Sequence, residues 1–277
     1  MQLLLFFYTL VGLVVGSFLN VCIHRLPRKE SIVFPGSHCP LCDNTIKPYD
    51  NIPVLSYLLL RGKCRSCKRS ISFQYPLVEL LSGLAFCSCG LEWNFAPATF
   101  INSLFLSVVI VLMFIDYHHK ILPNVLTLPG TVIGILLSPL QSRVYYDDIA
   151  SLNLASLLPF EDVQFPLPWV GSILGAVIGA GVLYLVAFAY ELTRKKQGLG
   201  MGDVKMMAMV GAFLGWQLAL LTIFAGSFLG SLCGIFLMLF HGKNLQFKIA
   251  FGTFLGAGAA LSLFFGLSFI HWYLNTF

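Results

Sequence analysis

Long runs of apolar residues dominate this chain and constrain its fold more than any other feature. An α-helix needs about 20 apolar residues to cross a bilayer, and about eight runs approach this length. They lie near residues 1–23, 76–93, 97–115, 124–140, 167–191, 203–215, 217–240 and 250–273. Charged residues make up only 10% of the chain and the mean hydropathy is +0.84, which leaves too few polar side chains for a water-facing surface. The sequence therefore predicts an all-α polytopic membrane protein with about eight transmembrane helices.

Two polar stretches, residues 24–75 and 141–165, interrupt the apolar runs. We expect a first transmembrane helix at 1–23, a small cytoplasmic domain at 24–75 and a seven-helix transmembrane domain at 76–277. Basic residues follow the first run instead of preceding it. This order predicts a retained anchor rather than a cleaved signal peptide.

The basic residues predict the orientation, because lysine and arginine remain on the cytoplasmic side of a membrane. If the stretch 24–75 is cytoplasmic, alternate loops share that side, and Arg143 alone among the 17 basic residues falls outside. Both chain termini are then outside, and the net charge of +5 reflects this asymmetry rather than nucleic-acid binding. The acids on the outer face are Asp147, Asp148, Glu161 and Asp162. The basic residues assigned to the cytoplasmic face are Arg25, Arg28, Lys29, Lys47, Arg61, Lys63, Arg65, Lys68, Arg69, Lys120, Arg194, Lys195, Lys196, Lys205, Lys243 and Lys248.

Four cysteines form two Cys-x-x-Cys pairs in the predicted cytoplasmic stretch. They are Cys39, Cys42, Cys64 and Cys67. Each two-residue spacer lets both sulfurs point at one metal, and two such pairs complete a closed tetrahedral zinc site. The cytoplasm is reducing, so two disulfides are the less favoured alternative, together with unbound thiols. We therefore expect structural zinc that supplies folding energy to a segment too small for its own core.

The remaining cysteines and a neighbouring histidine are expected to have no ligand role. His38 is an alternative ligand beside Cys39, but it is better explained as a solvated loop residue. The cysteines of the apolar runs are predicted to be small packing residues. They are Cys22, Cys87, Cys89 and Cys233.

Two aspartates stand at the ends of apolar runs on the predicted cytoplasmic face. Asp116 ends the third run, and Asp203 follows Gly200-Met201-Gly202 at the start of the sixth. Ionisable residues in such a chain are functional candidates. Two carboxyl groups in one partly buried site share a proton, which is the chemistry of an aspartic protease. The alternative is that each residue only ends or caps a helix, with Asp203 as an N-cap.

The chain resembles the type IV prepilin peptidases, bacterial inner-membrane aspartic proteases of the Gly-x-Gly-Asp class. The matching stretches extend over nearly the whole length, and any one alone is weak. Besides the two cysteine pairs they are GSFLNV at 16–21, HRLP at 24–27, NIPVLS at 51–56, LLLRGK at 58–63, YPLVE at 75–79, GMGDVK at 200–205 and GAFLGW at 211–216.

The resemblance implies that Asp116 and Asp203 are the catalytic pair. The substrates would be prepilins or pseudopilins, cut at the cytoplasmic membrane face between a short basic leader and a hydrophobic helix. Many members of the family also methylate the new amino terminus with S-adenosylmethionine, an activity that the family links to the cysteine-bearing segment. Glu79, one turn into the second run, is a candidate for that site or for contact with the substrate amine, and pairing with a loop arginine is its alternative role.

Three positions depart from the family pattern. Asn124 stands where the family often has Asp, Gln74 where it often has Arg, and Ala250 where it favours Pro before Phe-Gly. None of the three touches the proposed catalytic pair. The pairs Gly171/Gly175 and Gly252/Gly256 have the spacing of closely packed membrane helices.

Two other classes of protein compete with the protease interpretation. One is a transporter whose aspartates bind a cation or proton, which predicts charges at the bilayer midplane and an internal repeat. The acids lie instead at the membrane edge. The other is a structural zinc-bearing subunit, which leaves both aspartates unexplained. Oligomeric state and the particular pilin are not encoded in these patterns.

Overall fold

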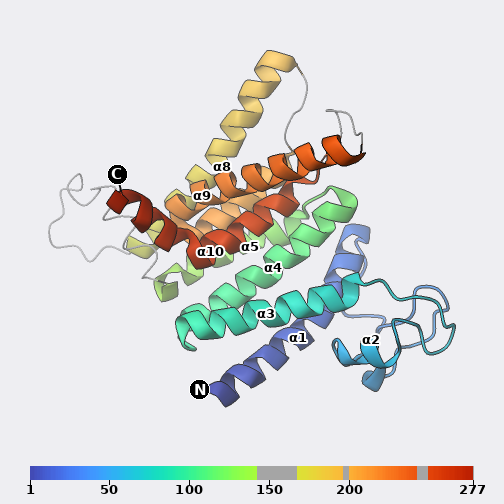
Figure 1. Ribbon diagram of the computed structural model, residues 1–277. Helices are drawn as coiled ribbons and strands as arrows, with labels where there is room; N and C mark the ends of the chain where they lie inside the picture. The colour runs from blue at the N-terminus through green and yellow to red at the C-terminus, as the bar shows by residue number, and fades with distance from the viewer. Residues whose placement is uncertain (142–166, 196–199, 242–248, 277) are drawn as a thin grey trace. The chain divides into compact units, whose positions relative to one another are not determined.

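The computed structural model describes residues 1–141, 167–195, 200–241 and 249–276 (Figure 1). This part of the chain is helical and contains no strand beyond two isolated β-bridges, so the predicted all-α class is confirmed. The α-helices are α1 (Gln2–Arg25), α2 (Leu55–Leu59), α3 (Gln74–Trp93), α4 (Pro97–His119), α5 (Asn124–Leu137), α8 (Leu167–Arg194), α9 (Met201–His241) and α10 (Phe251–Thr276). Three short 3-10 helices cover Leu26–Arg28, Pro48–Asp50 and Ser138–Gln141.

Several residues used in the charge argument lie outside the described residues. They are Arg143, Asp147, Asp148, Glu161, Asp162, Lys196, Lys243 and Lys248. The orientation of the loops therefore stays a prediction.

Six of the described helices are long and apolar enough to cross a bilayer. The second predicted span forms α3, which is not among the six, and the sixth and seventh predicted spans both fall in α9. All eight predicted segments are therefore helical, and the count of eight spans is supported in part.

α9 reverses direction at Gly215, where the sixth and seventh predicted spans meet. Gly215 has φ 79° and ψ 175°, a conformation that side-chain-bearing residues rarely adopt. A Cβ on Gly179 would lie 2.7 Å from the carbonyl oxygen of Met207 and 3.4 Å from the Cβ of Ala219. In a straight helix, Met207 and Ala219 would stand about 18 Å apart along the axis. Residues 201–214 and 216–241 therefore form two helices that turn back on each other.

The chain divides into two compact units, residues 1–115 and 116–277. In the first unit, glycines let α1 and α3 pack with almost no side chain between them. A Cβ on Gly16 would lie 2.6 Å from the Cα of Glu79, and a Cβ on Gly12 would lie 2.7 Å from the Cβ of Phe86. α4 joins them through Tyr8, whose hydroxyl donates to Ser103 Oγ at 2.8 Å.

In the second unit, α8 crosses α9 with the two backbones in contact (Figure 1). A Cβ on Gly175 would overlap the carbonyl oxygen of Gly211, and a Cβ on Gly211 would overlap that of Gly175. The close packing predicted from the Gly171/Gly175 spacing is thus confirmed at Gly175. This crossing lies between Asp203 and the reversal at Gly215, so it helps determine the position of the first turn of α9.

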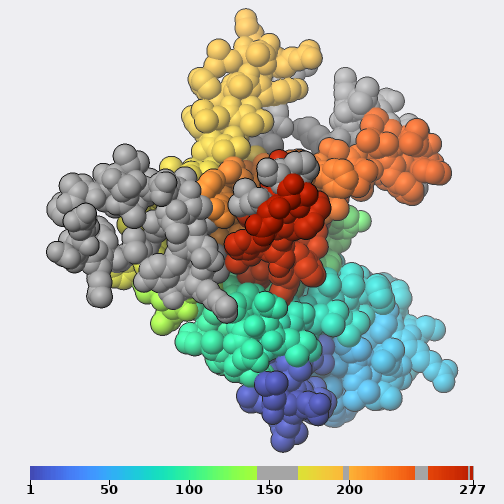
Figure 2. Space-filling model, turned by 60° about the vertical axis from the view of Figure 1, so that its left-hand side comes forward, coloured from blue at the N-terminus to red at the C-terminus, as the bar shows by residue number. Residues whose placement is uncertain are grey.

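The second half of α9 packs mainly against α10, and the two run antiparallel. Gly226 and Gly258 meet at this contact, where a Cβ on Gly258 would lie 2.9 Å from the nitrogen of Gly226. Figure 2 shows the ends of α8 (yellow) and α9 (orange) projecting from the rest of the second unit. Their large apolar side chains are exposed, as expected for helices that face lipid.

Candidate active site and metal centre

The two Cys-x-x-Cys pairs form knuckles with the same backbone structure. In the first, the N–H of Cys39 donates to Asn44 O, and the N–H of Asp43 donates back to Cys39 O, both at 2.9 Å. The residue after the second cysteine, Asp43, is left-handed with φ 53°. This tight turn brings both sulfurs of the pair to one side.

The second knuckle repeats each of these contacts at the matching residues. The N–H of Cys64 donates to Arg69 O at 2.9 Å, and the N–H of Lys68 donates to Cys64 O at 3.0 Å. Lys68 is left-handed with φ 59°, and an isolated bridge joins Lys63 to Ser70 as another joins His38 to Thr45. Each pair thus carries its own local scaffold.

The four cysteine sulfurs converge as the sequence predicts. Their Sγ atoms all lie within 4.8 Å of one another, and Cys39 Sγ lies 3.9 Å from Cys67 Sγ. A tetrahedral zinc with Zn–S bonds of about 2.3 Å separates its sulfurs by about 3.8 Å. All four are free cysteines, which contradicts the disulfide alternative. His38 is exposed and hydrogen-bonds Gly36 O at 3.1 Å, outside the cluster.

The electrostatics of the cluster favour a bound cation. Backbone N–H groups of Cys67 and Ser66 stabilise the thiolate of Cys64 and lower its pKa to about 7. At Cys42 the backbone N–H of Asn44 acts in the same direction, but burial and the neighbouring thiols Cys39, Cys67 and Cys64 outweigh it and raise the pKa to about 11. The sulfurs thus resist carrying several negative charges together. A divalent cation would remove that repulsion.

Asp116 lies in the last turn of α4 and is only 5% exposed. Its Oδ2 accepts the backbone N–H of Thr253 at 2.9 Å and the Thr253 hydroxyl at 3.4 Å. Thr253 is the third residue of α10, whose free N–H groups favour a negatively charged partner. Gly252 makes this approach possible, because a Cβ there would lie 2.9 Å from Asp116 Oδ2.

Asp203 lies in the first turn of α9 and is half-buried. It interacts electrostatically with Asp116 and with the backbone of Gly200. The helix begins at Met201, so Asp203 is its third residue and the N-cap alternative is wrong. The structure thus brings both predicted catalytic residues into one site at the ends of two helices.

Leu122 separates the glycines that flank this site. A Cβ on Gly202 would lie 3.0 Å from Leu122 Cβ, and a Cβ on Gly252 would lie 3.0 Å from Leu122 Cδ1. One leucine therefore packs against the glycine that precedes Asp203 and the glycine that contacts Asp116. The sequence patterns assign no role to Leu122 or Thr253, although two departures from the family pattern, Asn124 and Ala250, lie within three residues of them. Helix-packing geometry was needed to identify them.

Asn124, one of the departures, has a partner in the first turn of α9. Its Oδ1 accepts a hydrogen bond from Lys205 Nζ at 3.0 Å. This bond links the start of α5 to the turn that carries Asp203. It gives position 124 a role in packing these helices together rather than in chemistry.

Glu79 lies in the first unit and is 8% exposed. Its Oε2 accepts the backbone N–H of Val54 at 2.7 Å, and its side chain also interacts with Ser17. Val54 has φ 61° and ψ −48°, a strained conformation for a β-branched residue. The partner of Glu79 is thus loop backbone, and not the loop arginine of its alternative role.

Comparison with known proteins identifies the family. The model of the bacterial peptidase A24 N-terminal domain matches residues 10–93, and that of the type IV leader peptidase family matches residues 103–235. A prepilin leader peptidase/N-methyltransferase of Aeromonas hydrophila is 34% identical over 97% of this chain and 93% of its own length. The chain belongs to the type IV leader peptidase family.

Other relatives agree with this assignment. Proteins of the same name from Pseudomonas aeruginosa and Aeromonas salmonicida are 33% and 32% identical, each over 96% of this chain and 92% of its own length. No solved structure matches the chain. Nothing in these comparisons supports the transporter alternative.

Proposed function

We propose that the protein is a prepilin leader peptidase in which Asp116 and Asp203 are the catalytic carboxyl groups. The decisive observation is their meeting in one partly buried site, although they lie far apart in the sequence. Membership of the type IV leader peptidase family supplies the reaction. As the resemblance implies, the prepilin substrates would carry a short basic leader before a hydrophobic helix.

The pair would perform general acid–base hydrolysis. One carboxylate takes a proton from water as the oxygen attacks the peptide carbonyl, and the other carboxylic acid donates a proton to the carbonyl oxygen. Breakdown of the tetrahedral intermediate breaks the C–N bond, and a proton passes to the leaving amine. Two coupled carboxyl groups titrate as a pair, so the two roles belong to the dyad.

Thr253 supports this chemistry as a positioning residue. Its N–H and hydroxyl both reach Oδ2 of Asp116, which orients the carboxyl group. The distribution of basic residues supports a cytoplasmic location for this face and for the cysteine domain, with both termini outside.

The cysteine cluster would hold structural zinc. Four converging sulfurs, with one separation of 3.9 Å, fit a tetrahedral four-thiolate centre. Four thiolate ligands would leave no open coordination position for substrate. The metal would therefore stabilise the loop fold and take no part in peptide cleavage.

N-methylation of the new amino terminus is the second activity that the family name supports. S-adenosylmethionine would be the methyl donor, as the resemblance implies. Glu79 does not fit a donor-binding role, because it is buried and its carboxylate already binds the N–H of Val54. Its contacts suit a residue that holds the loop segment around α2 against α3.

The test is prepilin cleavage in liposomes by wild type, Asp116→Asn and Asp203→Asn, with products weighed by mass spectrometry in the presence of S-adenosylmethionine. Each variant should lose at least about a thousandfold in rate, because half the dyad cannot exchange protons. Glu191→Gln on α8 is the matched control carboxyl and should cleave normally. Cleavage surviving in either aspartate variant would refute the assignment, and an added methyl mass in the wild-type product would establish the second activity.

A further inference from the structure

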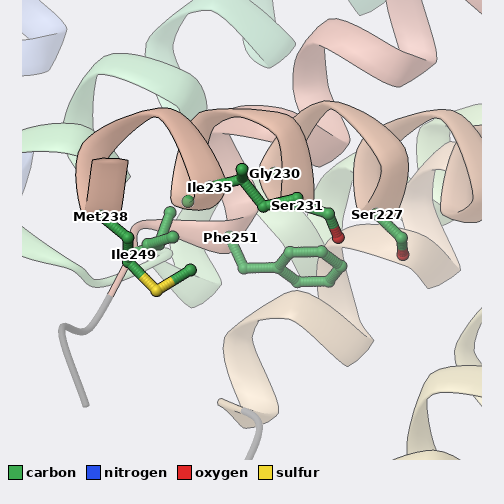
Figure 3. Close-up of a pocket in the computed structure, with 8 residues that line it drawn as sticks. Ser227, Gly230, Ser231, Ile235, Met238, Ile249 and Phe251 are labelled. Atoms are coloured by element: carbon green, nitrogen blue, oxygen red, sulfur yellow. The ribbon is translucent and has the colours of Figure 1, made fainter. Parts of the chain in front are cut away.

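A cavity of about 520 Å³ lies along the second half of α9, beside the start of α10 (Figure 3). Gly230, Ser231 and Gly234 line it on α9, with Met238 further along the same helix. In Figure 3 the Phe251 ring lies along α9 near Ser231, and Ile249 lies close to Met238. We call this cavity the α9–α10 groove.

The groove ends at the residues that hold Asp116. Phe251 lines it, and the next two residues are Gly252, which packs against the Asp116 carboxyl, and Thr253, which donates hydrogen bonds to it. An endopeptidase substrate is a continuous chain that must extend away from the cleavage site on both sides. The α9–α10 groove is therefore placed where one side of that chain would continue.

The lining suits an apolar helix better than a polar peptide. Ser227 and Ser231 are small, exposed and one helical turn apart on α9, which lets another helix approach the backbone closely in a bilayer. Met238, Ile249 and Phe251 add apolar surface. A basic leader would find no acidic side chain among the residues that line this cavity.

We propose that the α9–α10 groove binds the hydrophobic helix that follows the scissile bond of the prepilin. This inference rests on the proposed function and adds the surface that receives the substrate's membrane segment. The helix would pack against Ser231 and Ser227, with its amino-terminal end at Phe251. Its scissile bond would then lie beside Asp116.

Ser227→Leu in liposomes tests the proposal by filling the groove. Ser227 lines the groove and is exposed, so a larger side chain there would extend into the groove. Gly181→Leu on α8 is the matched control, since a Cβ there meets nothing within 4 Å. Two substrates are compared: a full-length prepilin, and a short peptide with the leader and only the first residues after the scissile bond.

For Ser227→Leu, the KM for the full-length prepilin should rise at least about tenfold, while kcat/KM for the short peptide stays at the wild-type value. Wild-type cleavage of both substrates would overturn the proposal. An equal loss of kcat/KM for both substrates would also overturn the proposal, because it would indicate a disturbed dyad. If that loss varied with lipid chain length, the groove would hold an acyl chain instead. Asp203→Asn separates this test from the proposed function. If Asp203→Asn still cleaves the short peptide, the assignment of the dyad is wrong. If it does not, the dyad stands and the groove variant tests the groove alone.

A photocrosslinking amino acid at position 231 tests the occupant directly. Ser231 is exposed and lines the groove, so the probe should label the hydrophobic helix of full-length prepilin. The same probe at position 181 should give at most background labelling. Equal labelling from both positions, or labelling of the leader alone at position 231, would contradict the proposal.

Discussion

The cysteine cluster and the aspartate pair are built in opposite ways. Each cysteine knuckle is made by hydrogen bonds within a few residues, such as the contact of Cys39 with Asn44. Asp116 instead depends on Thr253 at the start of another helix, and Asp203 on where α9 begins. One site is assembled locally, and the other by the packing of long helices.

This difference predicts which changes each site tolerates. A local site should survive rearrangement of distant helices but fail when its ligand is removed. A site made by helix ends should be sensitive to any glycine that permits a helix crossing. Four predictions test this contrast, from the largest expected effect to the smallest.

Removing the proposed zinc should have the largest effect, confined to the first unit. Structural zinc contributes about 10–16 kcal/mol of apparent binding free energy in small zinc-dependent folds, so Cys42→Ser should release the metal and unfold the loop. Zinc content measured by mass spectrometry should fall from one per chain to near zero, and proteases should cut within residues 39–67. Cys233→Ser, outside the cluster, should keep its zinc. Protease resistance without metal would show that the loop folds on other contacts.

Adding one methyl group at the helix crossing should damage the aspartate site alone. A Cβ on Gly211 would overlap the carbonyl oxygen of Gly175, so Gly211→Ala must push α8 and α9 apart. Overpacking of this kind costs about 1–3 kcal/mol or more. Peptidase activity should fall sharply while zinc content stays at one per chain.

Gly181→Ala is the matched control for this prediction, because a Cβ there has no neighbour within 4 Å. It should retain full activity and wild-type thermal stability. Normal cleavage by Gly211→Ala would mean that the dyad does not depend on the crossing. Loss of zinc in Gly211→Ala would mean that the cysteine site is not locally assembled.

The same contrast explains what the sequence predicted and what it did not. Cys39 and Cys42 indicate their site because ligand spacing and backbone turn are both encoded within one short segment. The reversal at Gly215 was also predictable, since the apolar pattern breaks there and only glycine tolerates its conformation. Helix lengths and the glycine contact at Gly175 followed from composition and spacing.

The surroundings of the aspartates were not predictable in this way. Asp116 and Asp203 were identified as residue types in unusual places, and the resemblance joined them into a pair. Thr253 and Leu122 do not stand out in the sequence, because threonine and leucine are common residue types in apolar helices. Their roles arise from where α10 starts relative to α4, which is a property of the packed structure.

Removing one hydrogen bond from the dyad's support should have a moderate effect. Thr253→Val keeps the backbone N–H at Asp116 but deletes the hydroxyl donor. Loss of such a bond corresponds to roughly a two- to tenfold decrease in kcat, with KM unchanged because the hydroxyl acts through Asp116. Steady-state cleavage of prepilin measures both constants. Thr193→Val on α8 is the control, since its hydroxyl bonds only its own helix.

The return of full activity in Thr253→Ser would sharpen this result, because serine restores the hydroxyl without the methyl group. If valine and serine variants were equally impaired, the methyl packing of Thr253 would matter rather than its hydrogen bond. An unchanged kcat in Thr253→Val would mean that the backbone N–H groups of Gly252 and Thr253 suffice to hold Asp116.

The smallest effect is expected at an ion pair that braces the second knuckle. Arg65, between Cys64 and Cys67, donates to both oxygens of Asp50, with Nε to Oδ2 at 2.8 Å. These hydrogen bonds, with the charges of Arg65 and Lys47, lower the pKa of Asp50 below its usual range. Asp50→Asn should therefore speed zinc release to a chelator slightly at pH 7.

The direction of the pH dependence follows from the lowered pKa. Because the folded domain favours ionised Asp50, the stabilisation is complete above the ordinary aspartate pKa of about 4 and disappears as the pH falls through the lowered value. Acid also protonates the cysteine ligands. The informative quantity is therefore the difference in the rate of zinc release between wild type and Asp50→Asn at each pH. Arg65 is 55% exposed, so salt should reduce the same difference by screening the pair. A difference that persists at high salt would mean that Asp50 acts through packing, and the cysteine site would then depend on more than its own two turns.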